Sequence, residues 1–163
     1  MNNACEYKRL SSRLRYEPDT GNFFWLIGCG KVKPGDKASY IKDSGYITLG
    51  KRRVPAHRVA WFIFYKENPP EFIDHINGDR CDNRICNLRA ATISQNQMNK
   101  KKGLSNTSGV KGVHFDSWSG RWRAEIKLNG IKMKIGRFTS KEEAHKAYCE
   151  KAKELFGEFW NPG

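Results

Sequence analysis

The chain of 163 residues has room for one domain or two small ones, and its 38% apolar and 12% aromatic residues can build a core, which excludes a disordered chain. Its formal net charge of +13 is shared by both halves and fits a polyanionic partner such as nucleic acid, with simple solubility as the alternative. No apolar run reaches roughly 18 residues and the N-terminus lacks the apolar core of a signal peptide, so we expect no membrane span and a cytoplasmic location.

The first part of the chain alternates strand and helix patterns. Residues 1–20 indicate a short helix or irregular lead-in that ends at a Pro-Asp-Thr-Gly turn. Residues 22–27 and 45–50 predict strands, separated by a loop rich in Gly and Lys. The apolar spacing after Pro55 predicts a mostly buried helix, which the two prolines at 69 and 70 stop.

A polar turn lies between two short strand patterns in the middle of the chain. Residues 72–76 predict one strand, residues 77–84 the turn, and residues 85–91 the return strand. Thr92 and Gln95 then form a capping-box pattern, which predicts a helix over residues 94–101. The expected order is a hairpin followed by a helix.

The last part predicts a second small module. Residues 99–109 have the lysine run and small polar residues of a linker. Three strands are expected at 110–115, 121–128 and 131–138, and an Asn-Gly pair joins the last two. Ser140 and Glu143 form a capping box for an amphipathic helix that reaches about Phe156. The fold class is therefore α+β.

The five cysteines do not indicate a disulfide framework, because their number is odd and they are scattered. Cys81 and Cys86 are the only close pair, and no second pair is available to complete a zinc tetrahedron. We therefore expect free thiols and no structural zinc.

The hairpin residues match the needs of phosphodiester hydrolysis. The reaction requires a base that deprotonates water and a cation that stabilises charge on the phosphate and the leaving oxygen. His75 suits the first role, and oxygen ligands such as Asp74 and Asn96 suit Mg²⁺. Asn-Gly and Asp-Asn clusters are also ordinary turn formers, so taken singly these residues do not decide the matter.

Taken together, residues 74–99 resemble the HNH endonuclease motif in the variety found in homing and phage-borne nucleases. The resemblance implies a ββα-metal hairpin and helix, with His75 as general base and Asn87 as the residue that braces the hairpin. It implies Asp74 and Asn96 as ligands of one divalent metal, Mg²⁺ first and Mn²⁺ as the alternative. Arg58 or Arg84 could hold a DNA phosphate, while His57 is interpreted as a structural residue of the buried helix.

Residues 108–157 resemble the plant ethylene-response-factor DNA-binding domain of the Apetala-two type, which also occurs fused to HNH nucleases. The resemblance implies a three-stranded antiparallel sheet packed on one helix, with the exposed sheet face in the DNA major groove. His114, Asp116 and Lys134 depart from the plant pattern, so its sequence preference is not transferred. DNA contact is implied for Lys111, His114, Trp118, Glu125, Lys127, Lys132 and Lys134; a basic solvated face is the alternative.

The sequence thus predicts a DNA endonuclease that nicks double-stranded DNA and is of the homing type. We expect a nuclease domain at 1–99, a linker at 100–108 and a DNA-binding domain at 109–163. A monomer or homodimer is expected, without an obligate protein partner or membrane, in the host cytoplasm if a phage encodes the chain. The alternatives are a DNA-binding regulator with a silent hairpin and an RNA-binding protein, which the groove-reading sheet disfavours because A-form RNA hides its major groove.

Overall fold

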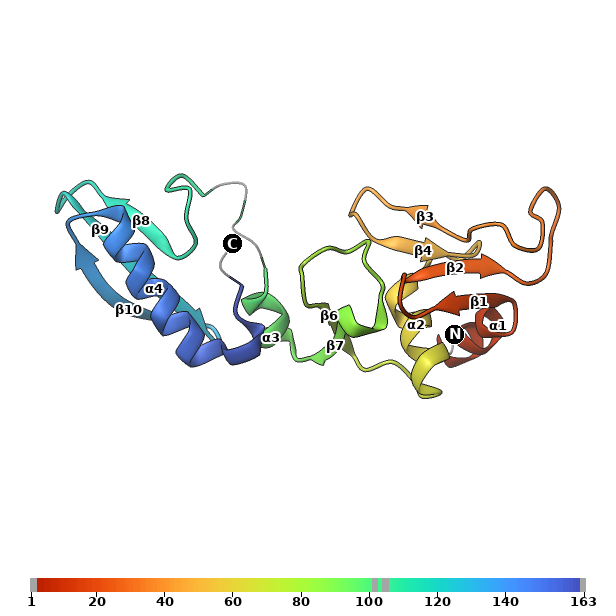
Figure 1. Cartoon of the computed structure of the whole chain (residues 1–163). Coiled ribbons are helices and arrows are strands. Elements are labelled where there is room, and N and C mark those ends of the chain that lie inside the picture. The colour runs from red at the N-terminus through yellow and green to blue at the C-terminus, as the bar shows by residue number, and fades with distance from the viewer. Residues whose placement is uncertain (1–2, 101–102, 104–105, 162–163) are drawn as a thin grey trace. The chain divides into compact units, whose positions relative to one another are not determined.

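The computed structural model describes residues 3–100, 103 and 106–161. The chain divides into two compact units, Met1–Ala91 and Thr92–Gly163, and each combines helices with small antiparallel sheets (Figure 1). The α+β class is therefore confirmed. The division falls ahead of the segment 100–108, the predicted linker, of which residues 101–102 and 104–105 lie outside the described residues.

The first unit builds its core from an N-terminal helix, two small sheets and one central helix. Its first elements are α1 (Asn3–Ser11), β1 (Leu14–Glu17), β2 (Asn22–Trp25), β3 (Tyr40–Ile41), β4 (Ile47–Leu49), β5 (Val54–Pro55) and α2 (Ala56–Tyr65). Strands β1 and β2 form a hairpin, and β3, β4 and β5 form a second antiparallel sheet. Pro55 stands at the N-cap of α2, where its missing N–H costs the helix nothing.

Helix α2 supplies the centre of the first core. Val59 and Ala60 are fully buried in it, together with Leu10 of α1 and Phe23 of β2. The helix ends where Lys66 adopts a left-handed conformation and its N–H bonds to the Phe62 carbonyl. His57 and Arg58 lie at the other end of the helix, in its first turn.

The polar hairpin follows α2. Strands β6 (Phe72–His75) and β7 (Leu88–Ala91) pair antiparallel, with Asp74 opposite Arg89 and His75 opposite Leu88. The return strand is shorter than the predicted 85–91, because its first residues form the 3₁₀ turn η1 (Ile85–Asn87). Hydrogen bonds of the Asn87 side chain, described below, favour this turn over an extended strand.

The turn between β1 and β2 packs against the polar loop. Ile85 N–H donates to the Pro18 carbonyl (3.0 Å), and the Tyr16 hydroxyl donates to the Asn83 carbonyl (2.7 Å). Gly21 has a positive φ of 72°, and a Cβ there would lie 2.6 Å from Asn83 C and Arg84 N. Only glycine fits this contact without displacing the loop.

The second unit is a three-stranded sheet covered by one long helix. Its elements are α3 (Ile93–Met98), β8 (Val113–Asp116), β9 (Arg121–Leu128), β10 (Ile131–Phe138), α4 (Lys141–Phe156) and η2 (Gly157–Phe159). The strand order is β10-β9-β8, and Asn129 and Gly130 both have positive φ in the β9–β10 turn, as the Asn-Gly signal predicts. Ala124 and Ile126 of β9 pack against Ala144 and Tyr148 of α4.

We predict that Gly21→Ala destabilises the first unit more than Gly30→Ala does. Both glycines have positive φ, but nothing lies within 4 Å of a Cβ built at Gly30. Gly30→Ala should therefore lower the free energy of unfolding by about 1 kcal/mol through backbone strain alone. Gly21→Ala should lower it further because the new Cβ also clashes with the loop. Urea unfolding of both variants measures the difference; equal losses would show that the loop yields freely at Gly21.

Candidate active site and nucleic-acid interface

Asp74 is a buried carboxylate that faces an arginine across the hairpin. Its side chain is 4% exposed, and Oδ2 accepts hydrogen bonds from Arg89 Nε (2.9 Å) and Nη2 (2.8 Å). The register places the two residues directly opposite each other on β6 and β7. Because buried charges are stable only when paired, Arg89 fixes the orientation of this carboxylate.

His75 lies at the end of β6 and is 5% exposed. Its Nε2 lies 3.5 Å from Asn83 Oδ1, and its ring centroid is 5.1 Å from that of His57 in an edge-to-face arrangement. Burial lowers the pKa of His75, an effect that Asn83 and nearby carboxylates oppose. The imidazole is therefore held neutral near pH 7, the state in which it can accept a proton.

His57 belongs to the same cluster, although the sequence indicated only a structural residue. Tyr46 lies 5.5 Å from the His57 ring and 6.0 Å from the His75 ring, between centroids. Among the described residues the buried Nδ1 of His57 has no hydrogen-bond partner. Burial lowers the pKa of His57 to about 3, and the neighbouring His75 adds to the shift.

Asn87 braces the polar loop from the inside, as the resemblance implies. It is 6% exposed, and its Oδ1 accepts from Asn77 N–H (3.0 Å). Its Nδ2 donates to Asn77 Oδ1 (3.0 Å) and to the Asp82 carbonyl (2.8 Å). One buried amide thus joins both ends of the loop between β6 and η1.

The two arginines considered for phosphate contact lie in different surroundings. Arg58 donates from Nε to the Tyr7 hydroxyl (2.8 Å) and from Nη1 to the carbonyls of Pro70 (3.0 Å) and Glu71 (3.1 Å). Arg84 is more exposed and pairs with Asp82, with Nη2 2.6 Å from Oδ2. Arg58 therefore holds the segment after α2, and Arg84 is the better placed of the two to meet a ligand.

The two metal ligands that the sequence predicts, Asp74 and Asn96, belong to different compact units. Within the described residues no group of three or more His, Cys, Asp and Glu side chains is placed to hold a metal ion. All five cysteines are free thiols, and Cys81 Sγ donates to the Gly45 carbonyl (3.1 Å). A buried carboxylate at Asp74 and an amide oxygen at Asn96 are ligands of the kind that Mg²⁺ accepts.

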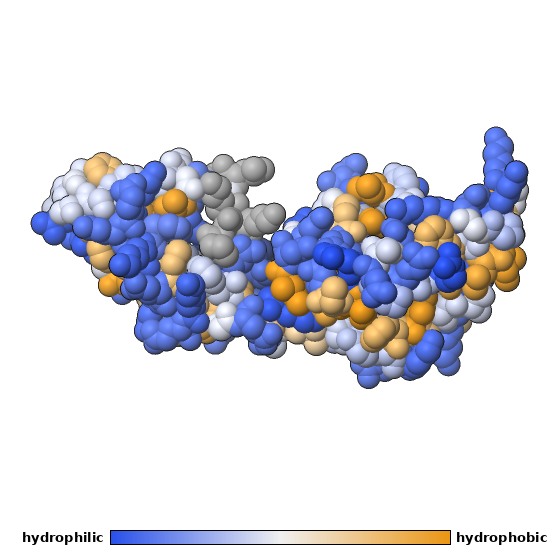
Figure 2. Space-filling model, in the orientation of Figure 1, coloured by the Kyte–Doolittle hydropathy of each residue, from blue (hydrophilic) through white to orange (hydrophobic). Residues whose placement is uncertain are grey.

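The sheet of the second unit presents one basic face. Arg121, Arg123, Glu125 and Lys127 alternate along β9 with the residues that pack on α4. The strand register adds neighbours from β8 and β10: His114 pairs with Arg123, Lys134 with Glu125, and Lys132 with Lys127. Hydrophilic residues cover most of this unit on the face seen in Figure 2.

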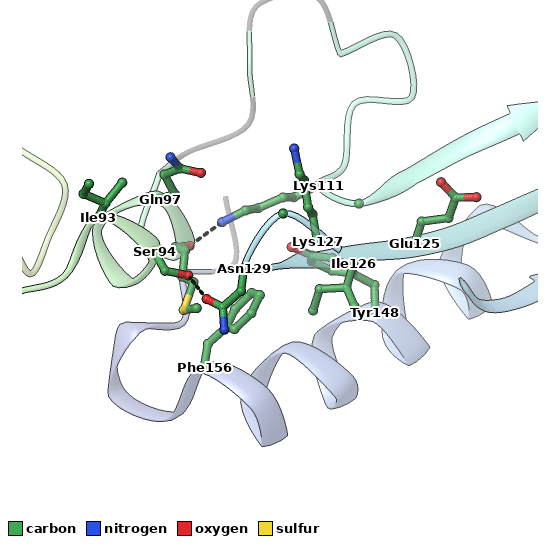
Figure 3. A pocket seen from close by; sticks show the side chains of 13 residues that line it. Ile93, Ser94, Gln97, Lys111, Glu125, Ile126, Lys127, Asn129, Tyr148 and Phe156 are labelled. Carbon is green, nitrogen blue, oxygen red and sulfur yellow. Dashed lines mark hydrogen bonds between the residues drawn. The ribbon is translucent and has the colours of Figure 1, made fainter. Parts of the chain in front are cut away.

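The residues proposed for DNA contact are not equally accessible. Trp118 is 89% exposed in the β8–β9 turn, and His114, Lys127, Lys132 and Lys134 are also exposed. Lys111 differs, because it is half-buried and its Nζ donates to the Met98 carbonyl (2.8 Å; Figure 3) and to the Asn161 carbonyl (3.1 Å). Asp116 forms an ion pair with Arg123, with Oδ2 2.7 Å from Nη2, and so neutralises part of the positive charge of the sheet face.

Asn96 lies on α3, and other residues of this helix line a groove within the second unit. The groove has a volume of about 610 Å³ between α3 and β9 and is lined by Gln97, Met98, Lys111, Lys127 and Asn129, among others (Figure 3). The capping box predicted for α3 is present, with Thr92 Oγ1 and Gln95 Oε1 each accepting from the other residue's N–H. Asn96 and the residues of the polar hairpin thus belong to different compact units.

Several residues of the cluster escaped the sequence analysis. Arg89, Tyr46 and Asn83 surround Asp74 and His75, yet they come from separate segments of the chain. Strand pairing could have indicated Arg89, since it stands opposite Asp74 in a four-residue hairpin. No spacing signal links Tyr46 to His75, because only the packing of β4 on α2 brings them together.

We predict that His57 makes the first unit labile in acid. Its folded pKa of about 3 lies below the unfolded value of about 6.5, so the unfolded chain binds more protons between these pH values. The contribution of His57 to the free energy of unfolding is fully present above about pH 6.5. Below that pH the free energy of unfolding falls by up to about 1.4 kcal/mol per pH unit. His57→Phe keeps an aromatic ring without a titrating group and should flatten this slope in urea unfolding; an unchanged slope would assign the acid lability elsewhere.

Comparison with known proteins bears on the polar hairpin. Residues 54–98, from β5 through α3, match the model of the HNH endonuclease family. An uncharacterized HNH endonuclease of Acanthamoeba polyphaga mimivirus is 35% identical over 128 residues, covering 76% of this chain and 65% of that protein. Protein 3.8 of Escherichia phage T7 is 37% identical over 59 residues, covering 36% of this chain and 49% of that protein.

The chain spans less than two thirds of the length of both relatives. No solved structure matches significantly. In the described part of the chain, no helix is long and apolar enough to cross a membrane. The matched segment contains Asp74, His75, Asn87 and Asn96, and together these findings support an HNH endonuclease domain in this part of the chain.

Proposed function

We propose that the protein is a DNA endonuclease in which His75 is the general base and one divalent cation assists. The observation that carries the proposal is the family match over residues 54–98, in which His75 stands at the end of a strand with its imidazole held neutral. Water attacks the phosphorus atom, His75 takes the proton of that water, and the leaving 3′-oxygen departs. A single set of catalytic groups cuts one strand, so a monomer nicks and a dimer can cut both.

The metal role falls to Asp74 and Asn96, as the family pattern implies. A divalent cation, Mg²⁺ first, supplies charge stabilisation at the phosphate when it is bound. Arg89 bonds to Oδ2 of Asp74 and so holds the carboxylate in one orientation, as partners of metal ligands commonly do. Asn87 keeps the loop beside His75 in shape and takes no part in proton transfer.

The second unit contributes DNA binding in this proposal. The support is its basic sheet face, on which Arg121, Lys127, Lys132 and Lys134 are exposed, together with the Apetala-two resemblance of its sequence. Exposed lysines and arginines bind phosphates at any sequence, and the exposed Trp118 and His114 can contact base edges or sugars. Arg84 of the first unit adds a phosphate contact from the loop of the catalytic hairpin itself.

We predict that His75→Ala removes nicking without removing DNA binding. Loss of a general base typically slows the chemical step by about 10²–10⁴-fold. The assay is conversion of supercoiled plasmid to the nicked form in Mg²⁺, with EDTA as the metal control and a gel-shift measurement of binding. His114→Ala is the matched histidine control, which should weaken binding and spare the chemical step at saturating protein. Cleavage by His75→Ala within a few-fold of the parent would place the base elsewhere.

We also predict that Asp74→Asn and Asn96→Ala each raise the Mg²⁺ concentration required for half-maximal nicking. Each change removes or weakens one oxygen ligand in a site with few protein ligands. Asp74→Asn keeps the shape of the side chain, so Arg89 retains a hydrogen-bond acceptor. Mg²⁺ titrations like that of the parent in both variants would rule out this ligand pair, and nicking that persists in EDTA would rule out metal assistance.

A further inference from the structure

Helix α3 is too short to be stable by itself. It spans Ile93–Met98, six residues, none of which is buried. Isolated helices below roughly 12–15 residues are marginal in water because few hydrogen bonds offset the cost of nucleation. The capping box at Thr92 and Gln95 stabilises its start, but the orientation of the helix depends on contacts outside it.

The last turn of α3 is held by a half-buried lysine. The final carbonyls of a helix have no partner within the helix, and the Met98 carbonyl is one of them. Lys111, which precedes β8, donates from Nζ to this carbonyl (2.8 Å) and to the Asn161 carbonyl (3.1 Å). A positive charge at this end of a helix is also favoured by the helix dipole. Lys111 thus joins α3 to the C-terminal segment of the same unit.

Three further contacts hold α3 within the second unit. Asn161 Nδ2 donates to Oδ1 of Asn99, the C-cap residue (3.1 Å), and the Met98 side chain packs against the second core. At the other end, Ser94 Oγ donates to Asn129 Oδ1 in the β9–β10 turn (2.7 Å), which Figure 3 shows beside the Lys111 contact. Asn96 lies between these two anchored ends.

We propose that Lys111 is a positioning residue for Asn96: by fixing α3 to the C-terminal sheet, it sets the direction of the proposed metal ligand. This inference rests on the proposed function. It moves Lys111 from the set of DNA contacts to the support of α3 within the second unit. Lys127, exposed in the same groove, remains a phosphate contact.

The test compares Lys111→Met with Lys127→Met in the full chain. Both remove one positive charge from the same groove and keep an aliphatic side chain. Lys111→Met should speed hydrogen exchange of the α3 amides and raise the Mg²⁺ requirement of nicking by about 10-fold, the effect typical of a lost partner behind a metal ligand. Lys127→Met should instead lower the slope of log affinity against log salt by about 0.9, with α3 exchange unchanged. Lys111→Arg retains donors and should restore both readouts.

Ser94→Ala tests the same support without any change of charge. It should speed α3 exchange and raise the Mg²⁺ requirement in the same direction as Lys111→Met, while the exchange of β9 and α4 shows that the unit stays folded. The inference is overturned if Lys111→Met changes the salt slope alone, or if α3 exchange is the same in Lys111→Met, Ser94→Ala and the parent. A parent chain without Mg²⁺-dependent nicking would overturn the proposed function, whereas α3 exchange reports on the support itself.

Discussion

The shape of the polar hairpin depends on buried side-chain amides. The loop between β6 and η1 consists mostly of polar residues, so no apolar core of its own can order it. Asn87 and Asn83 replace that core: Asn87 joins the two ends of the loop, and Asn83 lies against His75 while its carbonyl is fixed by Tyr16. Because a buried polar group without partners is costly, each of these hydrogen bonds excludes alternative loop shapes. His75 then receives a fixed environment from a loop that has almost no hydrophobic packing.

The surroundings of His75 combine two opposing influences. Burial among Tyr46, His57 and the hairpin lowers its pKa, whereas Asn83 and nearby carboxylates raise it. Asp74, the preceding residue of the same strand, pairs with Arg89. The hairpin thus places a buried histidine and a paired carboxylate at adjacent positions of one strand, each with its own partner.

Local patterns predicted the elements whose signals lie close together in the chain. Pro55 at the start of α2, the capping box of Thr92 and the Asn-Gly turn of β9–β10 depend on neighbouring residues, and the structure has all three. The capping box predicted at Ser140 is half formed: Ser140 Oγ accepts from Glu143 N–H, whereas the Glu143 carboxylate accepts from the Thr139 hydroxyl. The sequence does not predict the two-residue strands β3 and β5, because a run of two residues cannot show the alternation of apolar and polar residues that marks a strand. The role of Lys111 could not be read from the sequence, since its partners Met98 and Asn161 lie on opposite sides of it at long separation.

The position of α3 has a consequence for recombination between related genes. From the sequence alone, the boundary between the two modules is expected at the lysine-rich segment 100–108. The compact units meet earlier, between Ala91 and Thr92, and α3 is fastened to the later one. An exchange of C-terminal modules at the lysine-rich segment would leave the helix with foreign neighbours. A crossover at residue 91 would instead transfer the helix together with the sheet that supports it. We therefore expect that a C-terminal module of this kind is exchanged between genes together with α3, the last part of the HNH motif.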